Sequence, residues 1–261
     1  MKYRFACVCA FVFACSTSAR ADIISFREGV SPTGSYNHFG LDFRTNGQVN
    51  TSAELLVGNQ VSGVGLIRSL LGFDLSAIPA GSTINSITFT MKAFGTSTGT
   101  LAGVGDINVY EIRPNGNANN NMVETETSTT VWSTGNPWTN TLGDFESAIL
   151  STSVVNNANA NTTLDAGETI TYNSSAAWVA LAQSSLDAGL PLEFMLRSPT
   201  AEAGGVSNFY RMGSDGAVAV GDRPLLTIDY TAAVPEPGLV ALGLLTTAGF
   251  FGWRRLRNNR C

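Results

Sequence analysis

Few residues in this chain could carry out catalysis. His38 is the only histidine, so a Ser-His-Asp triad would have to recruit it from a segment rich in glycine, asparagine and serine. The sequence contains no G-x-S-x-G nucleophile elbow, no H-E-x-x-H zinc motif and no phosphate-cradling glycine loop. We therefore predict that His38 is a solvated loop residue and that the protein is not an enzyme.

Paired carboxylates are the remaining route to catalysis, because two acids suffice for glycoside chemistry. Of the 20 acidic residues, all but Glu236 lie between Asp22 and Ala233, which leaves 19 there, and no spacing singles out a pair. A polysaccharide-active enzyme, either a lyase or a glycoside hydrolase, is the alternative function.

Two tryptophans are better candidates for binding than any residue is for catalysis. Trp132 and Trp138 lie among small and polar residues of the kind found in loops. An exposed indole ring can stack on the apolar face of a sugar ring, so both are candidate glycan-binding residues. The alternative is that both pack against the edge of the fold, and the sequence favours neither interpretation.

Oxygen ligands for calcium are plentiful, although none of them has EF-hand spacing. Asp165 and Glu168 flank a short Ala-Gly step, and Asp106 and Asp144 lie close to expected loops. We predict no cofactor and keep a calcium site at these residues as an alternative.

The chain between its two ends is acidic and lacks cysteine. Cysteine occurs only at positions 7, 9, 15 and 261, so no disulfide, structural zinc or iron–sulfur cluster is expected in residues 22–233. Seven of the 15 basic residues lie at the ends, which leaves eight bases against 19 acids and a net charge of about −11. Such a surface repels phosphate backbones, so we expect no nucleic-acid partner.

The elements that must position these residues are mostly strands. Short segments with alternating polarity are separated by Gly, Pro and Asn, and the clearest are 84–91, 107–112, 192–197 and 225–230. In the first of them Ile87, Phe89 and Met91 share one face, whereas the facing of 107–112 is ambiguous. This pattern predicts an all-β fold, a jelly-roll-like β-sandwich.

One segment has helical periodicity instead. Trp178, Leu181 and Leu186 fall close to one helical face, an Asn or Ser residue near 173–175 can cap the start, and Gly189 can end the helix. We predict one short amphipathic helix on the sandwich, with Trp178 in the core. The Asn-rich stretches 115–121 and 151–161 are expected to be loops.

The N-terminal end is typical of a secretory signal peptide. Lys2 and Arg4 precede an apolar run over residues 5–15, and an A-x-A site ends at Ala21. We expect residues 1–21 to be removed on export and the mature chain to begin at Asp22.

The C-terminal end, residues 234–261, could be a membrane anchor, a buried strand or a sorting label. As a helix its apolar run over 239–253 would rise only about 22 Å, and flanking residues extend it to a marginal span over about 238–256. The basic tail 254–260 places the C-terminus on the cytoplasmic side and the body outside. Four residues of this tail, Arg254, Arg255, Arg257 and Arg260, form its basic cluster. A buried strand fits poorly, because the fold already closes with 225–230.

The order of these parts resembles the PEP-CTERM sorting signal. A Pro-Glu-Pro motif is followed by a short span and an arginine cluster, and the motif residues are Val234, Pro235, Glu236 and Pro237. The resemblance implies an exported protein of a polysaccharide-producing Gram-negative bacterium, processed near the motif by a membrane transpeptidase called exosortase. A plain C-terminal anchor would have the same hydropathy and is the alternative.

Residues 68–84, RSLLGFDLSAIPAGSTI, resemble the signature of the DNRLRE domain family. The family's tryptophan-containing central loop is similar to residues 131–132, 136–138 and 143–145. Its closing strand is similar to residues 223–230. The resemblance covers about residues 30–231 and implies a jelly-roll sandwich related to carbohydrate-binding modules. One departure is Met122 before Glu124, where the family has a tryptophan.

Together these features predict an exported, non-catalytic protein of the cell surface or extracellular matrix. We expect residues 22–233 to form the ectodomain and 234–261 to anchor it transiently in the membrane. The expected partners are exosortase and extracellular polysaccharide. A purely structural matrix role is a further alternative.

Overall fold

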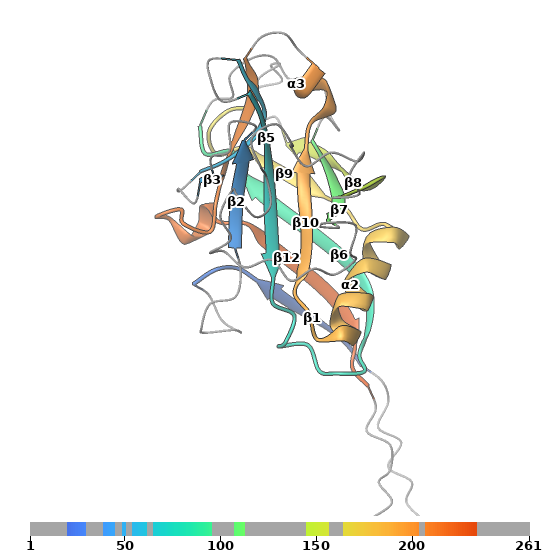
Figure 1. Ribbon diagram of the computed structural model, residues 1–261. Helices are drawn as coiled ribbons and strands as arrows, with labels where there is room; N and C mark the ends of the chain where they lie inside the picture. The colour runs from blue at the N-terminus through green and yellow to red at the C-terminus, as the bar shows by residue number, and fades with distance from the viewer. Residues whose placement is uncertain are drawn as a thin grey trace, which may run out of the picture. The chain divides into compact units, whose positions relative to one another are not determined.

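The computed structural model describes residues 20–29, 39–44, 49–50, 54–61, 65–95, 107–112, 145–156, 164–203 and 207–233 (Figure 1). Residues Ala21–Ala232 form one compact unit, and almost all of the other unit, Met1–Arg20 with Ala233–Cys261, lies outside the described residues. The early strands are β1 (Ala21–Phe26), β2 (Phe39–Arg44), β3 (Val49–Asn50), β4 (Glu54–Gln60), β5 (Gly65–Phe73), β6 (Thr83–Lys92) and β7 (Asn108–Ile112). The later elements are β8 (Phe145–Asn156), β9 (Thr169–Tyr172), α2 (Ala176–Ala188), β10 (Leu192–Arg197), α3 (Pro199–Ala203), β11 (Asn208–Gly213), the 3₁₀ helix η3 (Val220–Asp222) and β12 (Leu225–Thr231).

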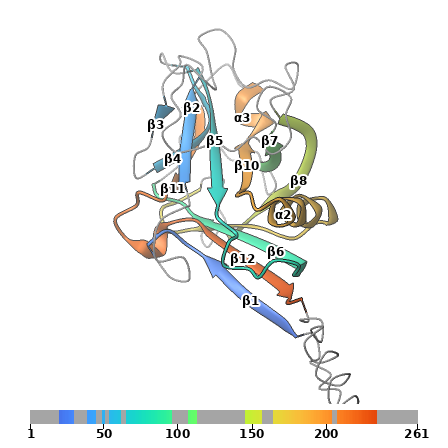
Figure 2. The same ribbon diagram turned by 60° about the horizontal axis from the view of Figure 1, so that its bottom comes forward.

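The strands form an antiparallel, β-sandwich-like architecture with two layers. The first layer has the order β1-β12-β6-β9-β8, and the second continues from β8 through β7, β10 and β5 to β2 and β3. β4 pairs with both β5 and β11. The long strand β8 belongs to both layers, and an isolated bridge between Ala93 and Met212 joins the end of β6 to β11. Figure 2 shows β6 and β12 running across the direction of β5 and β10. The mostly β-sheet prediction is therefore confirmed.

Alternating side chains explain why the central strands form. Ile87, Phe89 and Met91 of β6 are each 1 % exposed or less, as their shared face predicted. They lie opposite buried residues of β12 and β9, so one face of this layer is apolar. The segments 192–197 and 225–230 are also strands, as predicted. In β7 Val109 belongs to the main core, and Tyr110 and Ile112 are buried outside it.

An aromatic cluster fills the space between the layers. Phe89 lies 5.0 Å from Phe194 and 5.5 Å from Tyr172, measured between ring centroids. Trp178 lies edge-on to Phe194 at 5.6 Å and is fully buried. Edge-to-face rings of this kind add to the free energy gained from burial alone. The prediction that Trp178 is a core residue is confirmed.

Helix α2 lies along the part of the β6 edge that has no partner among the described strands. Strand β9 pairs only with Phe89–Lys92 of β6, which leaves earlier backbone groups on that edge without a strand partner. Side chains around α2 take that place, because Gln183 Oε1 accepts from the N–H of Ile84 and Ser174 Oγ accepts from the N–H of Ile87. Ser175 caps the helix start, and Gly189 ends it with a φ of 66°. Both caps follow the prediction.

Side-chain hydrogen bonds stabilise the turn after β5. Asp74 Oδ1 accepts from the N–H of Ser76 at 2.8 Å, and Asp74 Oδ2 accepts from the Ser76 hydroxyl at 2.9 Å. Gly81 has a φ of 78°, which a side chain rarely tolerates. Ile78 and Ile84 are buried on either side of the turn.

The structure corrects the predicted loop at 151–161. Its first half is strand, because β8 runs from Phe145 to Asn156. Serine replaces the expected apolar residues on the buried side: Ser151 Oγ donates to the carbonyl of Asn173, and Ser153 Oγ accepts from the N–H of Ile107. Hydrogen-bonded hydroxyls can be buried without the usual penalty, so the strand has no hydrophobic period. Two short helical elements, α3 and η3, add to the single predicted helix.

Within the part of the chain that the structure describes, no helix is both long enough and apolar enough to cross a bilayer. The sorting motif 234–237, the expected span and the arginine cluster lie outside the described residues, as do the expected signal peptide and the loop 115–121.

Candidate functional site

The structure describes only part of the predicted site residues. His38, Trp132, Trp138, Asp106 and Asp144 lie outside the described residues. The glycan-binding role of the two tryptophans therefore stays a prediction, as does a calcium site that includes Asp106 or Asp144.

Asp165 and Glu168 lie together in a tight turn between β8 and β9. A Glu168 carboxylate oxygen accepts from the N–H of Asp165 at 2.8 Å, and the N–H of Glu168 donates to the carbonyl of Asp165 at 3.1 Å. Gly167 permits the turn with a φ of 87°. The carboxylate of Glu168, 7 % exposed, thus stabilises its own turn. Among the described residues, no three His, Cys, Asp or Glu side chains gather as a metal site.

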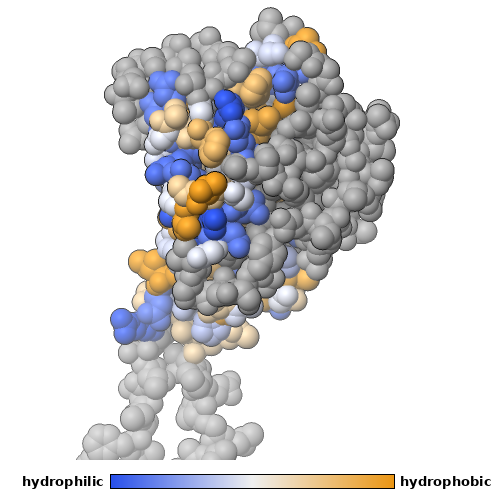
Figure 3. Space-filling view, turned by 90° about the vertical axis from the view of Figure 1, so that its left-hand side faces the viewer, coloured by the Kyte–Doolittle hydropathy of each residue, from blue (hydrophilic) through white to orange (hydrophobic). Residues whose placement is uncertain are grey.

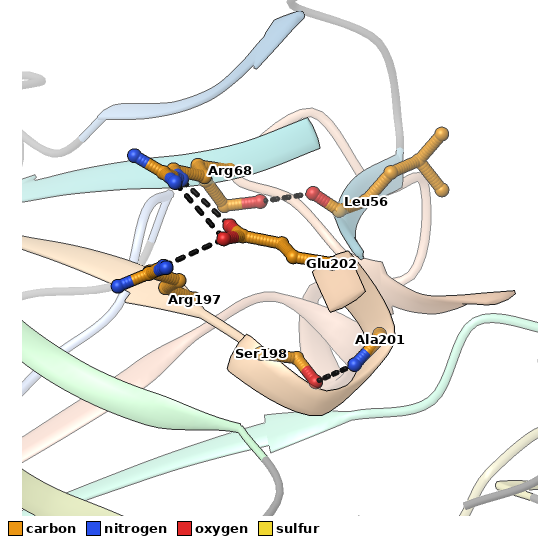
Figure 4. A network of polar contacts seen from close by, with 7 residues as sticks. Leu56, Arg68, Arg197, Ser198, Ala201 and Glu202 are labelled. Carbon is orange, nitrogen blue, oxygen red and sulfur yellow. Dashed lines mark hydrogen bonds and ion pairs between the residues drawn. The ribbon is translucent and has the colours of Figure 1, made fainter. Parts of the chain in front are cut away.

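A buried ionic cluster joins β5, β10 and α3 (Figure 4). Glu202 lies between two arginines: its carboxylate accepts from Arg68 at 2.6 and 2.9 Å and from Arg197 Nε at 2.7 Å. The side chains of Arg68 and Glu202 are 4 % and 6 % exposed, and that of Arg197 is 27 % exposed. The two parallel bonds from Arg68 fix the carboxylate in one orientation.

Helix α3 positions Glu202 in this cluster. Ser198 precedes the helix and its hydroxyl accepts from the N–H of Ala201, while Ala201 packs into the core. Pro199 follows at the first helical position, where its fixed backbone angle and missing N–H carry no cost. No sequence pattern singled out Glu202, and the Ser-Pro pair is the signal that could have indicated the helix.

Two further residues lie beside the cluster on β7. The Arg197 guanidinium lies 5.9 Å from the centroid of the Tyr110 ring, within cation–π range. Asn108 pairs directly with Arg197 across the sheet, so both side chains lie on one face. Asn108 Oδ1 is buried without a hydrogen bond. Arginine, asparagine and tyrosine are residue types that recognise sugars, but Tyr110 is 3 % and Asn108 6 % exposed.

The burial of this cluster favours a structural role. A polymer must reach the side chains that bind it, and here only Arg197 has substantial exposure among the members named. The cluster instead ties a short helix to two strands that lie far apart in the sequence.

Two further ion pairs of the described residues lie nearer the surface. Arg211 donates to Glu54 through Nε at 2.7 Å and through Nη2 at 2.5 Å, and this hydrogen bonding raises the pKa of Arg211. This pair is bidentate and half-buried. Lys92 lies 3.2 Å from Asp222, with both side chains well exposed, so this second pair contributes little to stability because water and salt screen it.

Exposed apolar side chains are scattered over the body. Among the described residues Val218 is 93 % exposed, Ile23 73 % and Val61 54 %. Figure 3 shows apolar and hydrophilic areas interspersed on the side it presents. Single exposed apolar residues of this kind are ordinary on protein surfaces.

No protein-family model and no curated protein sequence matches the chain. The proposed function therefore rests on the structure and on the sequence features described above, the family resemblances included.

Proposed function

We propose that this protein is an exported, non-catalytic component of the cell surface or extracellular matrix that associates with polysaccharide. In this proposal residues 1–21 are a signal peptide and 234–261 a PEP-CTERM-type sorting segment that exosortase recognises. The body is a DNRLRE-type sandwich with jelly-roll connectivity.

One observation carries this proposal. The compact unit spans Ala21–Ala232, which agrees to within one residue at each end with the proposed ectodomain 22–233, and this agreement supports the proposal. The body is acidic and without cysteine, so it has to be stabilised by its own core outside the cell. The core of aromatic and aliphatic side chains between the layers supplies that stability.

A binding assay on the full chain tests the proposal. The protein, kept in mild detergent, is passed over immobilised neutral and acidic polysaccharides, and we expect retention on at least one of them. Release of reducing or unsaturated ends from any of these polymers would instead favour the enzyme alternative. No retention on the whole panel would leave only a packing role.

Replacing the two candidate tryptophans tests their part. We expect Trp132→Ala and Trp138→Ala to abolish retention and to change the melting temperature by less than about 2 °C, because in this proposal both rings stack on sugar and do not pack in the body. Trp178→Ala is the matched control: it removes a fully buried ring and should cost about 3–5 kcal/mol of unfolding free energy. A comparably large loss of stability in the variant at position 132 or 138 would show that this tryptophan packs in the core.

A further inference from the structure

The outer face of the first layer carries an array of hydroxyl groups. Along β12 and β6 the buried residues alternate with outward ones, and most of the outward ones are threonine or serine. Their strand partners on β1 and β9 continue the pattern with Ser25, Thr169 and Thr171. We call this surface the hydroxyl face, and it comprises Ser25, Thr88, Thr90, Thr169, Thr171 and Thr227.

The strand register arranges these hydroxyls in rows. Ser25, Thr227 and Thr88 lie directly opposite one another across β1, β12 and β6. Two residues along β6, Thr90 lies opposite Thr171 of β9. Neighbouring strands lie about 4.8 Å apart and outward residues of one strand about 6.8 Å apart. The array therefore repeats on the scale of a single sugar ring.

The hydroxyls are accessible and largely uncommitted. Thr88, Thr90, Thr171 and Thr227 are partly exposed. Ser25 and Thr227 share a hydrogen bond at 3.1 Å, whereas within the described part of the chain no hydrogen bond involves the hydroxyls of Thr88, Thr90 or Thr171. β-Branched side chains in strands have few rotamers, so these hydroxyls lose little entropy on binding.

The charge and apolar content of the face restrict the partner. The outward positions of these strands include two charged residues, Lys92 and Asp229, whose charges have opposite signs. Lys92 is paired with Asp222, and Asp229 accepts from the side-chain amide of Asn85 at 3.0 Å. Exposed Ile23 and Val154, at the two margins, offer apolar contact. A neutral face on a body of net charge about −11 disfavours a polyanion.

We propose that the hydroxyl face is a docking surface for a neutral, hydroxyl-rich polysaccharide. Threonine hydroxyls would exchange hydrogen bonds with sugar hydroxyls, and the marginal apolar residues would contact ring C–H groups. This inference rests on the proposed function, because it assigns a surface and a ligand class to polysaccharide association, and it is separate from the part given to Trp132 and Trp138.

Threonine-to-valine exchange tests the face with little change of shape. Thr88→Val, Thr90→Val and Thr171→Val are combined in the full chain, since valine keeps the β-branch and replaces each hydroxyl with a methyl group of similar size. The probes are immobilised cellulose, xylan, dextran and galactomannan, with alginate as the polyanionic counterpart. The same exchange at exposed Thr200 of α3 is the control, and the triple Thr→Ser variant restores the hydroxyls.

We expect wild-type protein and Thr200→Val to bind at least one neutral probe equally well and the triple valine variant to bind it at least tenfold more weakly, with an unchanged melting temperature. The triple serine variant should bind within about threefold of wild type. Unchanged binding by a folded valine variant would overturn the inference. If the valine variant does not fold, a serine variant that folds and does not bind would also overturn it. Neither result contradicts polysaccharide association itself.

Three other results also overturn it. Binding of wild-type protein to alginate alone would assign an acidic ligand and keep the proposed function. Binding to none of the probes would contradict the proposed function and this inference together. If the triple valine variant differs from wild type in its sedimentation coefficient but not in its glycan binding, a second copy of the chain, not a polysaccharide, occupies the face.

Discussion

At the residue scale Glu202 has the most demanding environment. Its carboxylate compensates two guanidinium groups where little water is present, so the three side chains depend on one another. Removing one member of a buried ion pair is costly because the other charge keeps its desolvation penalty without the compensating attraction. Glu202 thus matters more to stability than its place in a five-residue helix suggests.

Glu202→Gln measures this dependence. We expect a loss of about 3 kcal/mol or more in unfolding free energy, read from urea denaturation, because Arg68 stays buried and charged. Asp222→Asn makes the matching carboxylate-to-amide change at the exposed pair with Lys92 and should cost less than about 1 kcal/mol. Similar losses for the two variants would show that burial of the cluster contributes little.

This cluster could not be predicted from the sequence. Arg68 and Glu202 lie 134 positions apart, and the pairing of β5 with β10 together with the packing of α3 against β4 brings them together. Nothing local marks either residue, since charged residues are usually solvated. Trp178 was different, because its spacing from Leu181 placed it on the apolar side of a helix whose two ends were both visible in the sequence.

At the element scale α2 shows how a helix can replace a strand. The helix supplies hydrogen-bond acceptors to β6 where no strand continues the ladder. Its first residues are held by Ser175, whose hydroxyl accepts from the N–H of Trp178 and donates to the carbonyl of Leu150 in β8. One side chain thus fixes both the start of the helix and its distance from the sheet.

Ser175→Ala tests this double role. We expect a loss of about 1–2 kcal/mol, at the upper end for a cap, because a bond to β8 is lost together with the cap. Ser184→Ala is the matched control, since Ser184 is exposed within the same helix and alanine is the better helix former there. Thermal or urea denaturation of both variants distinguishes them. Equal stability of the two would mean that the cap does not contribute.

The elements that the sequence predicted and those that it did not differ in how they bury polar groups. β6 and β12 alternate cleanly, because their inward residues are apolar. β8 buries Ser151 and Ser153 and satisfies them with hydrogen bonds from other segments, so a search for apolar alternation reads it as a loop. The candidate site was less predictable than the fold, because exposed hydroxyls form a pattern only once the strand register is known.

At the scale of the whole molecule, stability should depend on pH through one buried hydroxyl. Tyr172 is fully buried, its hydroxyl has no hydrogen bond, and burial raises the pKa of that hydroxyl well above its usual value near 10. The unfolded chain therefore releases this proton near pH 10 while the folded chain keeps it. The folded state binds more protons above pH 10, so its stability falls as the pH rises further.

Tyr172→Phe removes this linkage. At about pH 8 the unfolding free energy of the variant should equal that of wild type or exceed it by up to about 1 kcal/mol, because an unsatisfied buried hydroxyl is gone. At about pH 11 wild-type protein should lose more stability than the variant, measured by urea denaturation at both pH values. Parallel losses in the two proteins would place the alkaline sensitivity elsewhere.

The pairing of the first strand with the last also decides how the body responds to force. Asp22, the first residue of the proposed exported chain, lies opposite Tyr230 near one end of the β1–β12 ladder, and β12 is also hydrogen-bonded to β6 along its other edge. Tension applied to the chain after Thr231 and resisted by a ligand on the sheet acts along β12 and loads both ladders in shear, so many hydrogen bonds must break together. Tension between the two chain ends instead opens the β1–β12 ladder one pair at a time. If the sheet binds a polymer as proposed, the same body is therefore mechanically strong towards that polymer and weak towards a pull between its own ends.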